Sequence, residues 1–196
     1  DESVLVVGLG NPDITADAIG PLTAECVLVT RHLKSRLPEE FASFRPVSVF
    51  RTGVLGTTGI ESAALVRGVV SLVHPDRVIA VDALCAREVA RLCRAAQVTN
   101  AGVVPGSGVG NARSALTEET LGVPVVAVGV PTVVDARTLC ADLCGAETAL
   151  PEDTELFVTP RDIDSRVRDS ARLVGYSIDL ALHDALTIED IDMFLA

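Results

Sequence analysis

The stretch "VVGLGNPDITADAIGP", Val6 to Pro21, joins an apolar run to a predicted helix through a loop that carries two acids. The apolar run, residues 3–7, is typical of a strand that is buried on both faces of a parallel sheet. A helix is predicted over 21–34, because proline suits a first helical turn and apolar residues recur along one face. The loop between them, with Asp13 and Asp17, either binds a nucleotide or holds a carboxylate.

The glycines of this loop do not match a nucleotide-binding fingerprint. That fingerprint requires Gly-x-Gly-x-x-Gly directly before a helix, but Asp13 stands where the third glycine should be. A phosphate would meet negative charge there rather than free N–H groups. The sequence also has no Walker Gly-x-x-x-x-Gly-Lys motif. The loop therefore favours a carboxylate site.

Strands and helices alternate along the rest of the chain. Strands are expected at 3–7, 46–50, 78–81, 97–98 and 123–128, and helices at 21–34, 59–73, 87–94, 136–144 and 159–186, the last with Thr159 as its N-cap. This order predicts an α/β fold, a three-layer sandwich with a mostly parallel central sheet flanked by helices. We expect a single domain over residues 1–196, with a short linker around 144–155.

The composition provides a core and excludes some partners. The 196 residues are 48% hydrophobic but only 3% aromatic, so Val, Leu, Ile and Ala must form the core. The net charge of −11 argues against direct binding to nucleic acid or to an anionic membrane. No apolar stretch reaches the ~20 residues that span a bilayer. The chain begins at Asp1 rather than Met, so we expect a processed or trimmed chain.

Cysteines and histidines give little support for a metal site or a nucleophile. The five cysteines are odd in number and lack Cys-x-x-Cys spacing, so reduced thiols are expected. His32, His74 and His183 lie outside the predicted site loops, and no Gly-x-Ser-x-Gly elbow occurs. A Ser-His-Asp triad or a Cys-His pair is therefore disfavoured. We expect no metal and no cofactor.

Three acids follow predicted buried strands: Asp17, Asp82 and Asp135. Sites in parallel sheets lie beyond the carboxyl ends of the strands, although an Asp there can also simply cap the next helix. If the first and third strands are neighbours, Asp17 and Asp82 lie close together. Two close carboxylates do not both ionise readily, so one keeps a proton. Such a pair can activate water and protonate a leaving amine, which is the chemistry of metal-free peptide hydrolysis.

A second glycine-rich loop, "PGSGVGN", spans Pro105 to Asn111. Its glycines permit close approach of a ligand or of another chain segment. The loop is either a connector or the wall of a cleft that offers N–H groups to a peptide or to an oxyanion. The residues that we expect to line this cleft are Gly10, Asn11, Gly106, Ser107 and Gly108.

Several long stretches give the chain a specific resemblance to a known family. It resembles the germination protease family of spore-forming bacteria over most of its length, from Val4 to about Leu182. The matching stretches are "VVGLGN…TADAIGP", "LVTRHL", "FRPVSV", "GVLGTTGIES", "PDRVIAVDALCAR", "PGSGVGN…LTEETLGVPVVAVGVPTVVDA" and "LFVTPRDID".

The resemblance implies an atypical aspartic-type endopeptidase with Asp17 and Asp82 as the catalytic pair and Asp135 as a candidate supporting acid. It implies small acid-soluble spore proteins as substrates, cleaved at germination in the cytoplasm of the spore core. It also implies a zymogen, a homotetramer, and a phosphorylase/hydrolase-like fold similar to that of hydrogenase maturation endopeptidases.

Two other functions stay open at this point. One is a sporulation-associated binding protein that keeps the fold but cleaves nothing. The other is a nickel-dependent maturation peptidase, which the absence of histidine between Ala83 and Pro131 disfavours. The chain departs from the family pattern at Thr99-Asn100 and at Val104, and these two departures concern substrate specificity rather than the acid pair. It also departs in the short segment 144–155, where the family carries an insertion.

Overall fold

Six strands form one sheet in the computed structural model, which describes residues 2–110, 113–145 and 154–195. The main order is β2-β1-β3-β5-β4, and β6 also pairs with β5. Four strands are parallel: β1 (Val4–Gly8), β2 (Val47–Arg51), β3 (Arg77–Ala86) and β5 (Val125–Asp135). The short strands β4 (Gln97–Thr99) and β6 (Phe157–Val158) run antiparallel to β5. The predicted mostly parallel sheet is confirmed.

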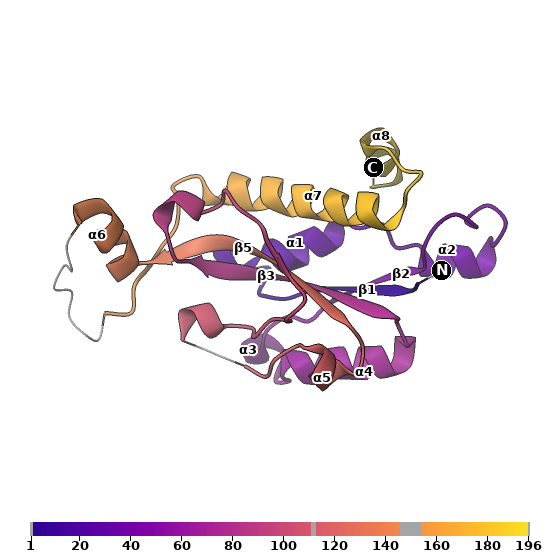
Figure 1. Ribbon diagram of the computed structural model, residues 1–196, viewed down its shortest axis with the longest axis horizontal. Coiled ribbons are helices and arrows are strands. Elements are labelled where there is room, and N and C mark those ends of the chain that lie inside the picture. Colours follow the sequence, from indigo (N-terminus) through magenta and orange to yellow (C-terminus); the bar gives the residue numbers. More distant parts are fainter. Residues whose placement is uncertain (1, 111–112, 146–153, 196) are drawn as a thin grey trace.

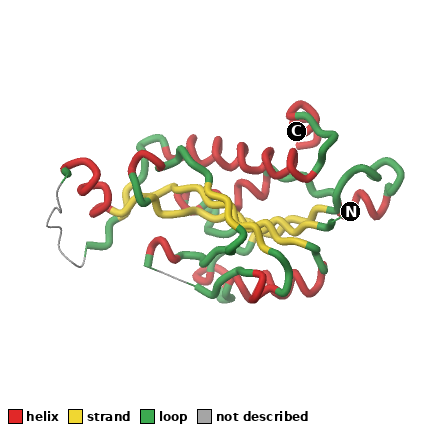
Figure 2. Tube along the Cα trace, viewed as in Figure 1, coloured by secondary structure: helices red, strands yellow, loops and turns green. Residues whose placement is uncertain are grey.

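Helices cover both faces of this sheet (Figures 1 and 2). One face carries α1 (Ile19–Glu25) and the long α7 (Ile163–Leu182), and the other carries α3 (Leu55–Thr58), α4 (Ser62–Val73) and α5 (Glu118–Leu121). The remaining helices, α2 (Arg31–Arg36), α6 (Ala136–Cys144) and α8 (Ile188–Leu195), lie toward the ends of the molecule. Short 3₁₀ turns occur at Thr15–Asp17, Val89–Arg91 and Ser107–Val109. This arrangement confirms the three-layer α/β sandwich.

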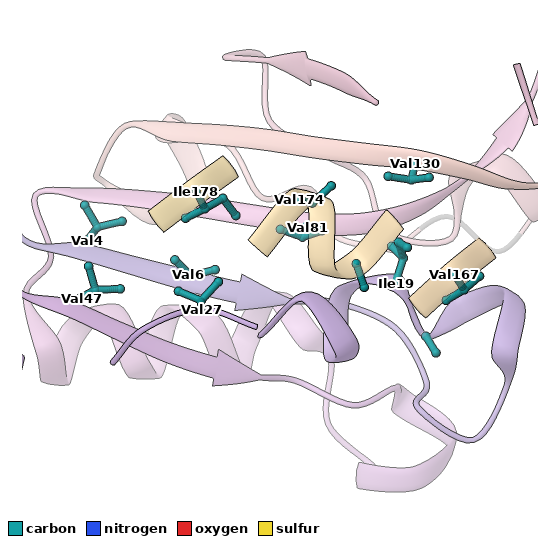
Figure 3. Packing of buried hydrophobic residues seen from close by; sticks show 12 residues of the cluster. Val4, Val6, Ile19, Val27, Val47, Val81, Val130, Val167, Val174 and Ile178 are labelled. Atoms are coloured by element: carbon teal, nitrogen blue, oxygen red, sulfur yellow. The ribbon is translucent and has the colours of Figure 1, made fainter. Parts of the chain in front are cut away.

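Strand β1 is buried along its whole length because its side chains alternate between two cores. Val4 and Val6 pack into the core beneath α1 and α7 with Val174 and Ile178 (Figure 3). Leu5 and Val7 belong to the core on the opposite face, which includes residues of α4. Full burial of one such side chain stabilises the fold by about 1.5–3 kcal/mol. The continuous apolar run in the sequence therefore reflects a central strand with two covered faces.

Close backbone contact joins α1 to the ends of β1 and β3. A Cβ atom added at Gly20 would lie 2.2 Å from the carbonyl oxygen of Leu9 and 2.5 Å from that of Val81. Likewise, a Cβ at Gly8 would lie 2.4 Å from the carbonyl oxygen of Gly20. These glycines let the helix sit directly on the strand ends, which fixes the course of the loop between them.

The predicted helix over 21–34 is wrong, because α1 ends at Glu25 and α2 begins only at Arg31. In the gap, the N–H of Leu28 donates to both carboxylate oxygens of Asp179, at 3.1 and 3.2 Å. This buried carboxylate takes the place of an intrahelical acceptor. Burial raises the pKa of Asp179 to about 7.

Other element bounds also differ from the predicted ones. The strands β3 and β5 run beyond their predicted ends to Ala86 and Asp135, because they continue to pair with each other. The last helix begins at Ile163 with Asp162, rather than Thr159, as its N-cap. It ends at Leu182, and α8 follows as a separate helix.

The segment 146–153, which makes up most of the predicted linker at 144–155, lies outside the described residues. Within the described ranges, no helix combines the length and the apolar character that a bilayer crossing requires.

Substitution Gly20→Ala is expected to destabilise the protein, because the new methyl group would meet backbone atoms that cannot move aside. The free energy of unfolding should fall by about 1–3 kcal/mol or more, as for overpacked cores. Gly68→Ala in α4 is the matched control, since nothing lies within 4 Å of its added Cβ. It should raise stability by about 0.5–1 kcal/mol. Urea unfolding of both variants tests this, and equal stabilities would contradict it.

Candidate active site

A cavity of about 950 Å³ lies at the carboxyl ends of the parallel strands. Its wall comes from the loop after β1, the start of α4, the second half of β3 and the second glycine-rich loop. Both predicted acids and all five predicted cleft residues line it: Asp17, Asp82, Gly10, Asn11, Gly106, Ser107 and Gly108. The structure thus brings together residues that are spread over more than ninety positions of the sequence.

Asp82 is a buried carboxyl group within β3, where it pairs in register with Gly129. It is only 6% exposed. The N–H of Ala83 donates to its Oδ1 at 3.0 Å. Burial, and then the nearby charge of Asp17, raise the pKa of Asp82 to about 7. Asp82 therefore changes its charge near neutral pH.

Asp17 ends the 3₁₀ turn after β1 and is half-buried. The N–H of Asn11 donates to its Oδ2 at 2.7 Å. Glycine at position 10 makes this approach feasible. Its φ is +111°, and the Cβ atom of any other residue there would lie 2.1 Å from the carbonyl oxygen of Asp17. Burial raises the pKa of Asp17, and the bond from Asn11 opposes this effect.

The two carboxyl groups interact electrostatically across the cavity, since the charge of Asp17 is among the causes of the raised pKa of Asp82. The hydroxyl of Thr132 in β5 donates to the carbonyl of Ala16 and so anchors the turn that carries Asp17. Near neutral pH, the cavity can hold one carboxylate together with one protonated carboxyl. Such a pair can serve as general base and general acid.

The second glycine-rich loop forms a wall of the cavity by packing against β3. A Cβ at Gly108 would lie 2.9 Å from the Cβ of Cys85, so a larger residue there would push the loop away. The loop is tied at its base by paired hydrogen bonds between Val103 and Leu116. Asn111, the last residue of the predicted motif, lies outside the described residues.

The structure separates Asp135 from the other two acids. It caps the N-terminus of α6, accepting from the N–H of Arg137 at 2.9 Å and that of Thr138 at 3.4 Å. It lies six residues beyond Gly129, the partner of Asp82, which is about 20 Å along an extended strand. It is not among the residues that line the cavity.

Sequence reasoning missed several charged residues of the cavity, chiefly Glu61 and Arg113. Their side chains form an ion pair, with 3.8 Å between Arg113 Nη1 and Glu61 Oε1. Glu61 could have been found, because it follows β2 as Asp17 follows β1, at the same edge of the sheet. No comparable signal pointed to Arg113, which comes from a long loop. Two further arginines, Arg87 and Arg91, also line the cavity.

Within the described parts of the chain, no three His, Cys, Asp or Glu side chains are grouped so that they could hold a metal ion. His183 is buried far from the acid pair, where burial and the charge of Arg45 lower its pKa to about 4. The expectation that no metal and no cofactor takes part stays a prediction.

Comparison with known proteins identifies relatives over the whole chain. Residues 1–147 match the family model of the germination proteases. A germination protease from Caldanaerobacter subterraneus is 41% identical, with 100% of this chain and 70% of the relative covered. One from Halalkalibacterium halodurans is 45% identical over 97% of this chain and 50% of the relative. One from Bacillus pumilus is 54% identical over 72% of this chain and 38% of the relative.

Among solved structures, the chain is similar to a NiFe hydrogenase maturation protease from Thermococcus kodakarensis. The TM-score is 0.51 with 19% identity, and 92% of each chain is covered. At this identity the likeness shows a shared fold. The predicted similarity in fold to hydrogenase maturation endopeptidases is thus confirmed.

Substitution Asp17→Asn is expected to lower the pKa of Asp82 from its value of about 7, because it removes a nearby negative charge. The pKa should stay above 3.8, since burial is the larger cause of the shift. Carbon-13 NMR of labelled aspartate carboxyl groups measures this titration. Asp135→Asn is the control and should leave the pKa of Asp82 unchanged. An unaltered value in Asp17→Asn would mean that the two carboxyl groups do not interact.

Proposed function

The chain belongs to the germination protease family, and from this premise we propose that it is a metal-independent, aspartic-type endopeptidase whose catalytic pair is Asp17 and Asp82. One observation carries the proposal: a carboxyl group on the turn after β1 and one within the neighbouring β3 line one cavity, and the second has a pKa of about 7. Family membership alone supports a protease. The pair supplies the chemical means for peptide hydrolysis without a metal.

The different environments of the two acids support a different role for each in this proposal. Burial raises the pKa of Asp17 as well, but this residue is only half-buried and the N–H bond from Asn11 opposes the effect, so in this proposal Asp17 acts as the base toward water. Asp82 is almost fully buried and holds its proton up to about pH 7, so it acts as the acid. Geometry and pKa together therefore give each group one task at the start of the reaction.

The reaction balances with these two groups and one water molecule. Asp17 takes a proton from the water molecule while the water oxygen bonds to the scissile carbonyl carbon. Asp82 protonates the carbonyl oxygen. The tetrahedral intermediate then breaks its C–N bond while Asp17 gives its proton to the leaving amine. The remaining hydroxyl returns a proton to Asp82, which restores both acids.

The substrates in this proposal are the small acid-soluble proteins of the spore core. The net charge of −11 suits a protein substrate that is released from DNA, and it disfavours contact with the DNA itself. The opening of the cavity between a turn, a helix start and a glycine-rich loop suits an extended peptide. A homotetramer and a zymogen belong to the same proposal, on the basis of the family resemblance.

Digestion of a purified small acid-soluble spore protein tests the proposal. The wild-type chain should produce discrete fragments with or without chelator, and Asp17→Asn or Asp82→Asn should lower the rate by at least about a thousandfold, since the two acids act together in each step. Gel electrophoresis and mass spectrometry of the fragments measure this.

Asp135→Asn is the matched control, since it makes the same change outside the cavity and asparagine caps helices as well as aspartate does. It should retain full activity. Cleavage that survives both catalytic substitutions would show that the site is wrong. Loss of activity with chelator would favour a metal-dependent peptidase, and no cleavage by the folded wild type would favour a binding protein.

The pH profile of kcat/KM follows from the assigned roles. Activity requires a protonated Asp82, so kcat/KM should fall about tenfold per pH unit above roughly pH 7. It should also fall on the acid side, at a pH above the ordinary aspartate value, because burial raises the pKa of Asp17. Initial rates between pH 4 and pH 9 provide the profile. A rate that stays constant from pH 7 to pH 9 would contradict the role of Asp82 as the acid.

A further inference from the structure

Strand β4 forms an open edge of the sheet. It is the last strand in the main order, and within the described ranges only β5 pairs with it. All three of its residues are exposed, and Val98 is 69% exposed. In an antiparallel pair, alternate residues direct their N–H and C=O groups away from the partner strand. One side of β4 therefore presents main-chain donors and acceptors to the solvent.

Proteins usually protect such an edge, because it pairs readily with another chain. The opposite edge of this sheet is partly covered, since Val47 at the start of β2 accepts from the N–H of Thr30 at 3.1 Å and donates to its hydroxyl at 2.9 Å. In β4, the residues Gln97-Val98-Thr99 include neither a charge nor a proline that would discourage pairing. Within the described part of the chain, no hydrogen bond joins the main chain of β4 to any segment other than β5.

This edge is continuous with the candidate active site. Asp82 pairs in register with Gly129 of β5, and Gly129 pairs in register with Gln97. The three residues form one row across the sheet, and side chains in such a row stand on the same face. Gln97 also lines the cavity that holds Asp82. The cavity therefore extends from the acid pair to the edge strand.

The spacing of the strands sets the reach from this edge to the acids. Neighbouring strands lie about 4.8 Å apart, so a chain added beside β4 would run three spacings, or about 14–15 Å, from Asp82. An extended peptide covers that distance in about four or five residues. A substrate can thus place one bond at the acids while a segment four or five residues away lies along β4.

We propose that β4 is a docking strand for the substrate. An extended segment of the substrate polypeptide, about four or five residues from the scissile bond, adds to β4 as a further strand of the sheet. This inference rests on the proposed function, because it assumes that the cavity cleaves a polypeptide.

The features of β4 favour a substrate over a second copy of this chain. Its three residues provide few main-chain bonds, which suits a ligand that must leave after cleavage rather than a lasting interface. Its contact with the cavity gives a bound segment a direct path to the acids. Main-chain pairing also depends little on side chains, so it can hold a segment whose sequence is not itself cleaved.

The test uses synthetic peptides that span one bond cleaved by the wild-type chain in a small acid-soluble spore protein. A short peptide has about three residues on each side of that bond, and two long peptides extend to about ten residues on one side or the other. One long peptide should have a kcat/KM at least about tenfold above that of the short peptide, mainly through a lower KM, because the added contacts form on binding. Equal values for all three peptides would overturn the inference.

N-methylation of single amides in the favourable extension tests the mode of binding. A paired strand turns every second N–H toward its partner, so methylation should lower kcat/KM at alternate positions, beginning about four residues from the bond. Each of these losses should be at least about threefold, and the amides between them should tolerate the methyl group. Losses without this alternation would contradict strand pairing. Since this measurement uses the wild-type chain, it does not depend on the folding of a variant.

Val98→Pro is expected to remove the docking edge, because proline either deletes an outward N–H or breaks the pairing of β4 with β5. It should lower kcat/KM for the favourable long peptide about tenfold more than for the short one. Val98→Thr is the matched control, since threonine keeps the main chain and suits strands, and it should retain the advantage of the long peptide. An equal loss for both peptides in Val98→Pro would contradict the docking role.

The possible failures can be told apart. If the wild type cleaves neither protein nor peptide, the proposed function itself fails. If cleavage requires both Asp17 and Asp82 but the long peptides have no advantage, only this inference fails. Pairing of two copies through β4 would appear in light scattering as a dimer that Val98→Pro dissociates, and this result would also overturn the inference.

Discussion

The parallel pairing of β1 with β3 is the constraint on which the site depends. Its register sets Gly8 beside Val81, and the N–H of Leu9 donates to the carbonyl of Val81 at 2.9 Å. Directly beyond this bond, the first chain segment enters the loop with Asp17, while the second continues into Asp82. Any change of register would move one acid relative to the other by at least about 3.3 Å. Two apolar cores hold this pairing in place from both faces of the sheet.

Burial lets Asp82 keep a proton for donation near neutral pH, and the same burial lowers the stability of the fold. A carboxyl group in a solvated loop would ionise well below neutral pH and could not keep a proton for donation. Within β3 it is 6% exposed, and its pKa is about 7. Because the unfolded chain ionises this group at its ordinary pKa of 3.8, the raised pKa lowers the stability of the fold progressively between about pH 4 and pH 7, and the loss is constant above pH 7. Asp179 shows the same effect in a structural role, where it holds the N–H of Leu28.

The cavity combines rigid and loop-borne parts. Asp82 lies on a central strand and Asp17 on a turn anchored by Thr132, so both acids have firm support. The opposite wall consists of the second glycine-rich loop, which is attached to the core through Val103, Gly108 and the ion pair of Arg113. A peptide would thus bind between a fixed pair of acids and a wall that rests on few contacts.

Local sequence patterns predicted the sheet, its two helical layers and the acid pair. The unbroken apolar run before Gly8 is sufficient for a central strand, and acids placed after such strands point to the carboxyl edge of the sheet. The patterns failed where distant groups decide the local structure. The helix predicted over 21–34 is interrupted because Asp179, more than 140 positions away, binds the N–H of Leu28. No pattern among neighbouring residues predicts such a contact.

The sequence by itself therefore determined the fold class, the candidate pair Asp17 and Asp82, and the glycines that line their cleft, because each depends on strand burial or on backbone space that a few neighbouring residues reveal. Only the tertiary structure decided which acids share a cavity. It assigned Asp135 to a helix cap, raised the pKa of Asp82, and brought Glu61 and Arg113 together. These properties depend on burial and on distances between segments, which arise only when the sheet and its helices pack together.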